Sequence, residues 1–173
     1  EGGSVYLGSD KEKETSTFAS HNLMKNKNSD SPGGVALTLS KAQFDFFNTT
    51  NPRGQGSALI LRSLTYFRMQ YINVHRSQAT SFIDITNCKG KAHVKYLIFS
   101  KTKANFAHVL VDKSGLSMIV SFIYATKTTG ILLRANNEQV VSITNIYVTT
   151  REQELFQGVL AETPHRMESL PPI

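Results

Sequence analysis

Five cationic residues recur along the chain at nearly constant spacing, and they form the clearest chemical pattern in the sequence. They are Arg53, Arg76, Lys101, Lys127 and Arg151, which are separated by 23, 25, 26 and 24 residues, with Lys103 beside the third. If the intervening segments stack on one another, these side chains form a row that could bind a linear polyanion such as an acidic polysaccharide. The alternative is that polar loops of a basic protein carry Lys and Arg only for solubility.

Asp84 and Asp112 are the acids considered for catalysis by paired carboxylates. Hydrolysis of a glycan needs two carboxyl groups several ångströms apart, and these two residues occupy nearby positions in neighbouring units of the sequence. The alternative reading, two solvated acids at strand edges or turns, is favoured. An enzymatic role is therefore considered, and a non-catalytic role is preferred.

The histidines and the single cysteine form no motif for a metal, a cofactor or a nucleophile. The sequence contains no C-x-x-C or H-x-x-x-H pair and no glycine-rich phosphate loop, so no metal site and no cofactor are predicted. His108 lies within an apolar run and is expected to be a hydrogen-bonded structural residue. Cys88 is next to Lys89, a neighbour that would favour the thiolate.

Composition indicates one folded β-rich domain. The chain has 173 residues, with 40% hydrophobic and 18% charged content and a formal charge of +6, which favours anionic partners. It is rich in β-branched and aromatic residues, and no run approaches the ~20 apolar residues of a membrane-spanning helix. The chain begins at Glu1 without an initiator Met or a signal-like segment, which suggests a processed or excised piece.

The cations belong to a longer repeat of about two dozen residues. Similar units begin at Gly34, Ser57, Ser81, Phe106 and Gly130, at spacings of 23, 24, 25 and 24 residues. Each unit has a short apolar run, a polar break, a longer apolar run and a closing polar stretch; the last break is expected at Arg134–Gln139. A near-constant period of this length indicates a stacked repeat architecture.

The repeat predicts an all-β fold, a right-handed parallel β-helix of about five rungs of ~24 residues. The alternative is an antiparallel β-sandwich or jelly roll, in which each unit is a hairpin with turns at Asn87–Gly90 and Asp112–Gly115. The constant period favours the β-helix, because sandwiches vary their connection lengths.

The alternation of apolar residues predicts which side chains point inward. Counting from the start of each unit places Val35 and Leu37, Ala58 and Ile60, Ala107 and Val109, and Ile131 and Leu133 inside. The third unit requires a slip of one residue, with Ile83 and Ile85 inward and Asp84 outward, since a buried carboxylate needs partners. Most aromatic residues lie in the longer runs and are expected inside: Phe44, Phe46, Phe67, Tyr71, Tyr96, Phe99, Phe122, Tyr124 and Tyr147. No exposed aromatic row suited to single-stranded nucleic acid is predicted.

The flanks differ in composition from the repeat. Residues 1–33 are polar and predicted to be an N-terminal arm or cap, 34–153 to be the β-repeat domain, and 154–173 to be a C-terminal tail. Neither flank is apolar enough to cover an open end of the solenoid alone. We therefore expect a homo-oligomer, a trimer or a larger assembly.

Three functional hypotheses follow. The preferred one is a non-catalytic structural or adhesive β-protein of a virus particle, phage spike or surface fibre, located on a virion or an extracellular surface, that contacts an acidic glycan through its basic edge. The others are a viral capsid-type β-sandwich protein and a fragment of a polysaccharide hydrolase or lyase. Nucleic acid is a less favoured partner than an acidic polysaccharide.

Overall fold

The structure, a computed structural model, describes the central part of the chain most fully. Residues 59–149, apart from the side chains at 137–140, and residues 155–158 are described with their side chains. The backbone is also described at 5–8, 16–25, 35–38, 41–50, 159–161 and 165–166.

The described chain is nearly all β-strand. The strands are β1 (Val5–Gly8), β2 (Ser16–Lys25), β3 (Val35–Thr38), β4 (Lys41–Thr50), β5 (Leu59–Arg62), β6 (Tyr66–His75), β7 (Gln78–Thr86), β8 (Lys89–Ser100), β9 (Lys103–Asp112), β10 (Gly115–Thr126), β11 (Thr129–Val148), β12 (Phe156–Ala161) and β13 (His165–Arg166). All the described pairings are parallel, in the order β1-β3-β5-β7-β9-β11-β10-β8-β6-β4-β2, with β12 and β13 on β11.

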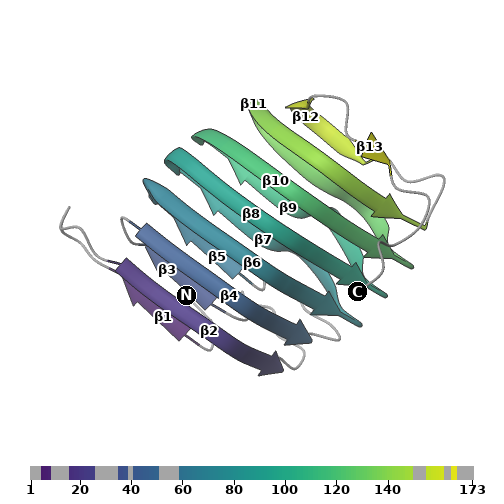
Figure 1. The fold of residues 1–173 in the computed structure, drawn as a ribbon, viewed down its shortest axis with the longest axis horizontal. Coiled ribbons are helices and arrows are strands. Elements are labelled where there is room, and N and C mark those ends of the chain that lie inside the picture. The colour runs from purple at the N-terminus through teal and green to yellow at the C-terminus, as the bar shows by residue number, and fades with distance from the viewer. Residues whose placement is uncertain are drawn as a thin grey trace.

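This strand order makes the molecule a β-solenoid with two main faces. The front sheet of Figure 1 contains β2, β4, β6, β8, β10 and residues 141–148 of β11; the back sheet contains β1, β3, β5, β7, β9 and residues 129–135 of β11. The chain crosses from one sheet to the other twice per coil and advances as a right-handed spiral (Figure 1). The predicted parallel β-helix is thus confirmed, and the antiparallel sandwich is wrong.

The break predicted at Arg134–Gln139 does not interrupt a strand. β11 runs from Thr129 to Val148. Its first part pairs with β9 and its second part with β10, so the polar stretch marks the place where the strand leaves one sheet for the other.

The core lies between the two sheets and is built from aligned columns of side chains. Along β6, Phe67 and Met69 point inward and are buried, while Tyr66 and Arg68 point outward. Phe67 stands in register with Ala92 of β8, which stands in register with Met118 of β10. Each large side chain removed from water in this way contributes about 1.5–3 kcal/mol, and the period-two alternation of the sequence sets which ones they are.

The register of the back sheet confirms part of the predicted pattern and corrects the rest. One buried column contains Leu59, Ile83, Val109 and Leu133, and the next contains Leu61, Ile85, Val111 and Ala135. Ile83 and Ile85 point inward and Asp84 outward, as predicted. The second unit was set one residue too early, so that Leu59 and Leu61, rather than Ala58 and Ile60, align with this column.

Irregular coil lengths explain the misplacement. The parallel register shifts between Ala79 and Ser81 and again between Thr129 and Ile131. Extra residues at these bulges are absorbed locally, so counting from a fixed starting point drifts relative to the true columns. Ile60 is nevertheless buried.

Aromatic residues form two columns on the outside of the front sheet, which the sequence analysis did not predict. The rings of Tyr71 and Tyr96 stack at 4.7 Å, those of Tyr96 and Phe122 at 4.9 Å, and those of Tyr124 and Tyr147 at 5.2 Å. Tyr71 is 38% exposed and the other four are partly buried. The prediction that these five rings lie inside is therefore wrong, whereas Phe67 and Phe99 are buried as expected; the side chains of Phe44 and Phe46 lie outside the described residues.

Bulges with an unusual backbone conformation expose these rings. Tyr71 and Tyr96 have φ angles of 53° and 59°, in the left-handed region that bulky residues rarely adopt. At each bulge two consecutive side chains face outward, Gln70 with Tyr71 and Lys95 with Tyr96, so the alternation of the strand is broken at the aromatic residue.

Both flanks contribute strands to the sheets. β1 and β2, within residues 1–33, pair in parallel with β3 and β4, and β12 pairs with β11 while Leu155 and Phe156 pack against the core. The division into an arm or cap, a repeat domain and a tail stays a prediction. Within the described residues no helix is long and apolar enough to cross a membrane.

Gly130 offers a test of the coil-to-coil packing. Its φ angle is +98°, and a Cβ added there would lie 2.2 Å from the carbonyl oxygen of Ala104 in the preceding coil. Gly130→Ala is expected to lower the free energy of unfolding by about 2 kcal/mol or more, measured by urea denaturation. Gly115→Ala is the matched control, because nothing lies within 4 Å of its added Cβ; equal losses in the two variants would contradict this account of the packing.

Candidate functional site

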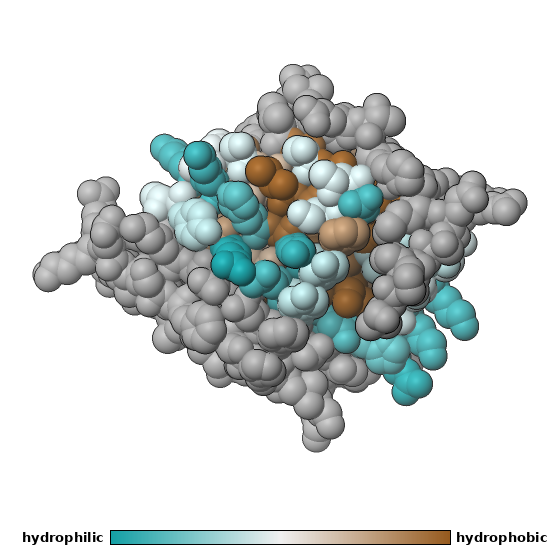
Figure 2. All heavy atoms as spheres, viewed as in Figure 1, coloured by the Kyte–Doolittle hydropathy of each residue, from teal (hydrophilic) through white to brown (hydrophobic). Residues whose placement is uncertain are grey.

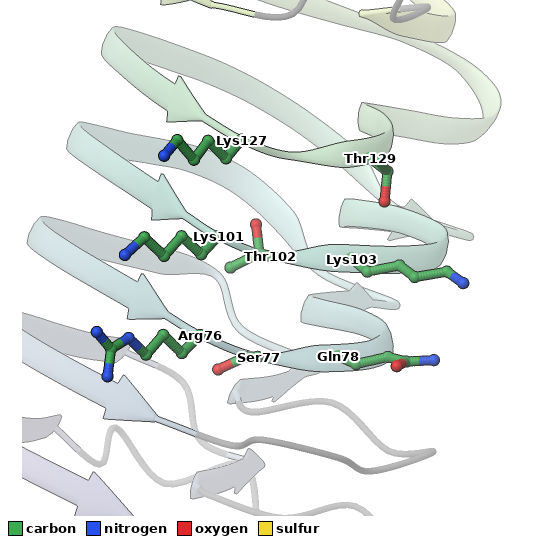
Figure 3. Close-up of a pocket in the computed structure, with 8 residues that line it drawn as sticks. All are labelled: Arg76, Ser77, Gln78, Lys101, Thr102, Lys103, Lys127 and Thr129. Carbon is green, nitrogen blue, oxygen red and sulfur yellow. The ribbon is translucent and has the colours of Figure 1, made fainter.

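Three of the predicted cations form a row at one corner of the solenoid. Arg76, Lys101 and Lys127 occupy the turns that lead from β6, β8 and β10 into the next coil, and all three are exposed. Their side chains extend to the same side of the corner, one above another (Figure 3). We call these three residues the cation row. Arg53 and Arg151 lie outside the described residues.

The backbone of each corner fixes the spacing of the row. Arg76, Lys101 and Lys127 have φ angles of 48°, 56° and 51°, and this left-handed residue reverses the chain. The Arg76 N–H donates to the carbonyl of Ser100, and the Lys101 N–H donates to that of Thr126, both at 2.9 Å. Because each coil is hydrogen-bonded to the next, the cations repeat at the interstrand distance of about 4.8 Å.

A buried hydroxyl residue follows each cation and completes the turn. These residues are Ser77, Thr102 and Thr128, whose side chains are at most 4% exposed. The Ser77 hydroxyl donates to the carbonyl of His75 at 2.8 Å, which is a local turn that Ser and Thr favour. The corner therefore places a small polar group inside and a long cationic side chain outside.

An open groove of about 470 Å³ runs over this corner, lined by Arg76, Ser77, Gln78, Lys101, Thr102, Lys103, Lys127 and Thr129. We call it the corner groove. Lys103 begins the back-sheet strand β9, and its side chain extends away from the cation row (Figure 3). The groove therefore has three cations on one side and a fourth on the other.

Charge is strongly segregated within the described chain. Among residues whose side chains the structure describes are eleven of the nineteen Lys and Arg residues, but two of the thirteen Asp and Glu residues. Those two acids, Asp84 and Asp112, lie on β7 and β9 and do not line the corner groove. Neighbouring exposed cations about 5 Å apart repel by only about 1 kcal/mol in water, so the fold tolerates the row.

Asp84 and Asp112 share one sheet face but are not in register. Asp84 aligns with Leu110, while Asp112 aligns with Thr86, so the two acids are diagonal neighbours on adjacent strands. The Thr86 hydroxyl donates to Asp84 Oδ1 at 2.9 Å, and Asn136 Nδ2 donates to Asp112 Oδ1 at 3.0 Å. Each carboxylate thus has its own structural partner, an arrangement that favours the structural reading of this pair.

His108 is a structural residue that supports the corner from inside. It is fully buried, with ring contacts to Phe82 and Phe99 at 5.4 and 4.8 Å. Its Nδ1 lies 3.0 Å from the carbonyl of Ile131, which can only accept, so Nδ1 carries the proton. Nε2 then accepts a hydrogen bond from the Thr102 hydroxyl at 3.0 Å. Burial lowers the pKa of His108 from 6.5 to about 4, so the imidazole is neutral near pH 7, as expected for a structural histidine.

Cys88 occupies the equivalent buried position at the opposite corner. Its side chain is fully buried, and burial raises the pKa of the thiol to about 11. The expectation that Lys89 would favour the thiolate is therefore wrong, because desolvation dominates. Among the described residues no group of three or more His, Cys, Asp or Glu side chains is placed to hold a metal ion.

The structure also brings together residues that the sequence analysis missed. A second groove, of about 310 Å³, lies on the front sheet and is lined by Tyr66, Arg68, Met69, Gln70, His93, Val94, Lys95, Ile119 and Ser121. We call it the front-sheet groove. The signal in the sequence was the alternation Lys89, Lys91, His93 and Lys95, which places four basic side chains on one face of a strand.

The protein has no recognised relative against which to compare these features: no protein-family model, curated protein or solved structure matches the chain.

The His108 environment predicts a pH dependence of stability. Between pH 6.5 and 4 the unfolded chain binds a proton that the folded chain does not, so this contribution is present above pH 6.5 and is lost as the pH falls towards 4. The full loss is about 3 kcal/mol. Urea unfolding across this pH range should show a steeper decline for the native chain than for His108→Gln.

The exposed His93→Gln variant serves as the control and should keep the native pH profile of stability. A parallel decline in the native chain and in His108→Gln would contradict the assigned role of His108.

Proposed function

We propose that this chain is a non-catalytic structural or adhesive β-solenoid that binds a linear acidic polysaccharide along the cation row. The observation that supports the proposal is the alignment of Arg76, Lys101 and Lys127 at one corner of three consecutive coils. In this proposal the protein is part of a virus particle, phage spike or surface fibre and acts as a homo-oligomer at the surface of a virion or cell.

The geometry of the row favours a polysaccharide among polyanions. Cations about 4.8 Å apart match a chain with one carboxylate per sugar, whose repeat is of similar length. Duplex DNA carries one charge per ~1.7 Å of its axis and curves around that axis, so it fits a straight row of three cations less well. The hydroxyl and amide groups of Thr129 and Gln78 in the corner groove suit the hydroxyl groups of sugars.

The residue types at the corner also favour binding over an ordinary solvated turn. The backbone needs a residue that tolerates a positive φ angle, and Gly or Asn would satisfy it at lower cost. Arg and Lys occupy the position in all three described coils instead. This choice has a reason if the charge itself is used.

A hydrolase or lyase that uses Asp84 and Asp112 is the second hypothesis, and it receives less support. Both carboxylates are engaged by structural hydrogen bonds, and neither residue lines the corner groove or the front-sheet groove. Turnover of an acidic polysaccharide that is abolished by Asp84→Asn would favour this hypothesis over the first.

A triple substitution tests the proposed function. Arg76→Asn, Lys101→Asn and Lys127→Asn together remove the three charges and keep a residue suited to the left-handed corner. The affinity for polygalacturonate, measured by biolayer interferometry, should fall about tenfold or more, because several weak ion pairs are lost together. The remaining affinity should depend less on salt.

Lys113→Asn is the matched control. Lys113 is exposed and has a φ angle of 48°, but it lies at the opposite corner. This variant should bind within about twofold of the native chain. A triple variant that unfolds at the native temperature and still binds with native affinity would contradict the proposal.

A further inference from the structure

The front-sheet groove combines features that a simple basic surface lacks. Arg68, His93 and Ile119 stand in register on β6, β8 and β10, and Gln70 stands in register with Lys95. The groove therefore has three basic side chains near its centre. In Figure 2, which views this sheet from outside, hydrophilic side chains cover the described part of the face, with hydrophobic ones among them.

Two apolar surfaces flank these basic groups. Tyr66 is 37% exposed and Ile119 is 40% exposed, and both line the groove. The ring of Tyr66 lies 6.3 Å from that of His93, at an angle of 44°, so it is held beside the basic groups. An exposed ring next to hydrogen-bond donors is suited to a ligand that has one apolar face and one polar edge.

We infer that the front-sheet groove is a subsite for a single sugar residue that carries an acidic group. The apolar face of the sugar packs on Tyr66 and Ile119. Arg68 and Lys95 bind the acidic group, and Gln70 and Ser121 are placed to hydrogen-bond the hydroxyl groups. This inference rests on the proposed function, because the ligand is the same acidic polysaccharide.

The subsite adds a property that the cation row cannot supply. A row of charges attracts any polyanion of suitable spacing, whereas packing against a tyrosine ring requires a ligand with an apolar surface. Lys95 and Lys101 are six residues apart on the same coil, which corresponds to about 20 Å along a strand. The groove and the row are thus separate contacts that can be changed independently.

Single-stranded nucleic acid, the other ligand class with rings and charges, fits the face less well. Proteins that bind it offer several aromatic faces in succession. Here the rings of Tyr71, Tyr96 and Phe122 stack on one another at 4.7 and 4.9 Å, with interplanar angles of 14° and 11°, so their faces are largely occupied. Of these exposed or partly exposed rings, Tyr66 is the one that lines the groove.

Tyr66→Ala, which leaves the charge unchanged, is the direct test. The probes are a short oligogalacturonate, polyphosphate and oligothymidylate, each titrated against the intact chain at low salt. Tyr66→Ala should weaken binding of the oligogalacturonate about fivefold and leave that of polyphosphate unchanged. Arg68→Gln combined with Lys95→Gln should weaken binding of the oligogalacturonate more than Lys89→Gln combined with Lys91→Gln, which removes equal charge outside the groove.

Three outcomes would overturn the inference. They are native oligogalacturonate affinity in Tyr66→Ala, equal losses in the two double variants, and a selective loss of oligothymidylate binding, which would assign the face to nucleic acid. Tyr66→Phe should bind as the native chain does, and circular dichroism checks that each variant is folded. Failure here leaves the proposed function standing if the triple variant of the cation row still loses binding, and loss at the groove alone would refute the row instead.

Discussion

Parallel stacking of coils in register is the constraint on which the other features depend. Backbone hydrogen bonds between successive coils hold equivalent residues about 4.8 Å apart, so a residue type that recurs once per coil becomes a continuous column. The buried column at Leu59, Ile83 and Val109, the stacked rings of the front sheet and the cation row all arise in this way. Function and stability therefore use the same periodicity, and they differ only in whether the repeated side chain points inward or outward.

The corners show which part of this arrangement the fold requires and which part it leaves open. A left-handed residue at a corner costs about 1 kcal/mol or more, and a buried small residue after it helps to offset that cost through hydrogen bonds such as that of Ser114 to the carbonyl of Asp112. The opposite corner meets the same requirement with Ser63, Asn87 and Lys113. Since a neutral residue satisfies the geometry there, the uninterrupted charge of the cation row is a property of the sequence at one corner and not a consequence of the fold.

The period of the sequence was sufficient to predict the fold class and the stacking of Arg76, Lys101 and Lys127, because both depend only on recurrence. It was not sufficient where the coil length varies: Leu59 and Leu61 were missed because bulges elsewhere change the count. The exposed aromatic column was missed for another reason. Tyr71 and Tyr96 adopt positive φ angles, and no Gly or Asn marks those positions. The front-sheet groove joins residues of three coils, so no single segment displays it.

The interior also contributes to the readiness of the edge for binding. Thr102, directly after Lys101, is hydrogen-bonded to the neutral imidazole of His108, whose other nitrogen is bonded to the next coil through Ile131. The corner backbone is thus fixed from inside, while both described carboxylates lie elsewhere on the back sheet. Cations held by backbone geometry rather than by ion pairs need not break a salt bridge to bind an anion. Preorganisation of this kind lowers the cost of association, which is how a short row of exposed charges can hold a flexible acidic chain.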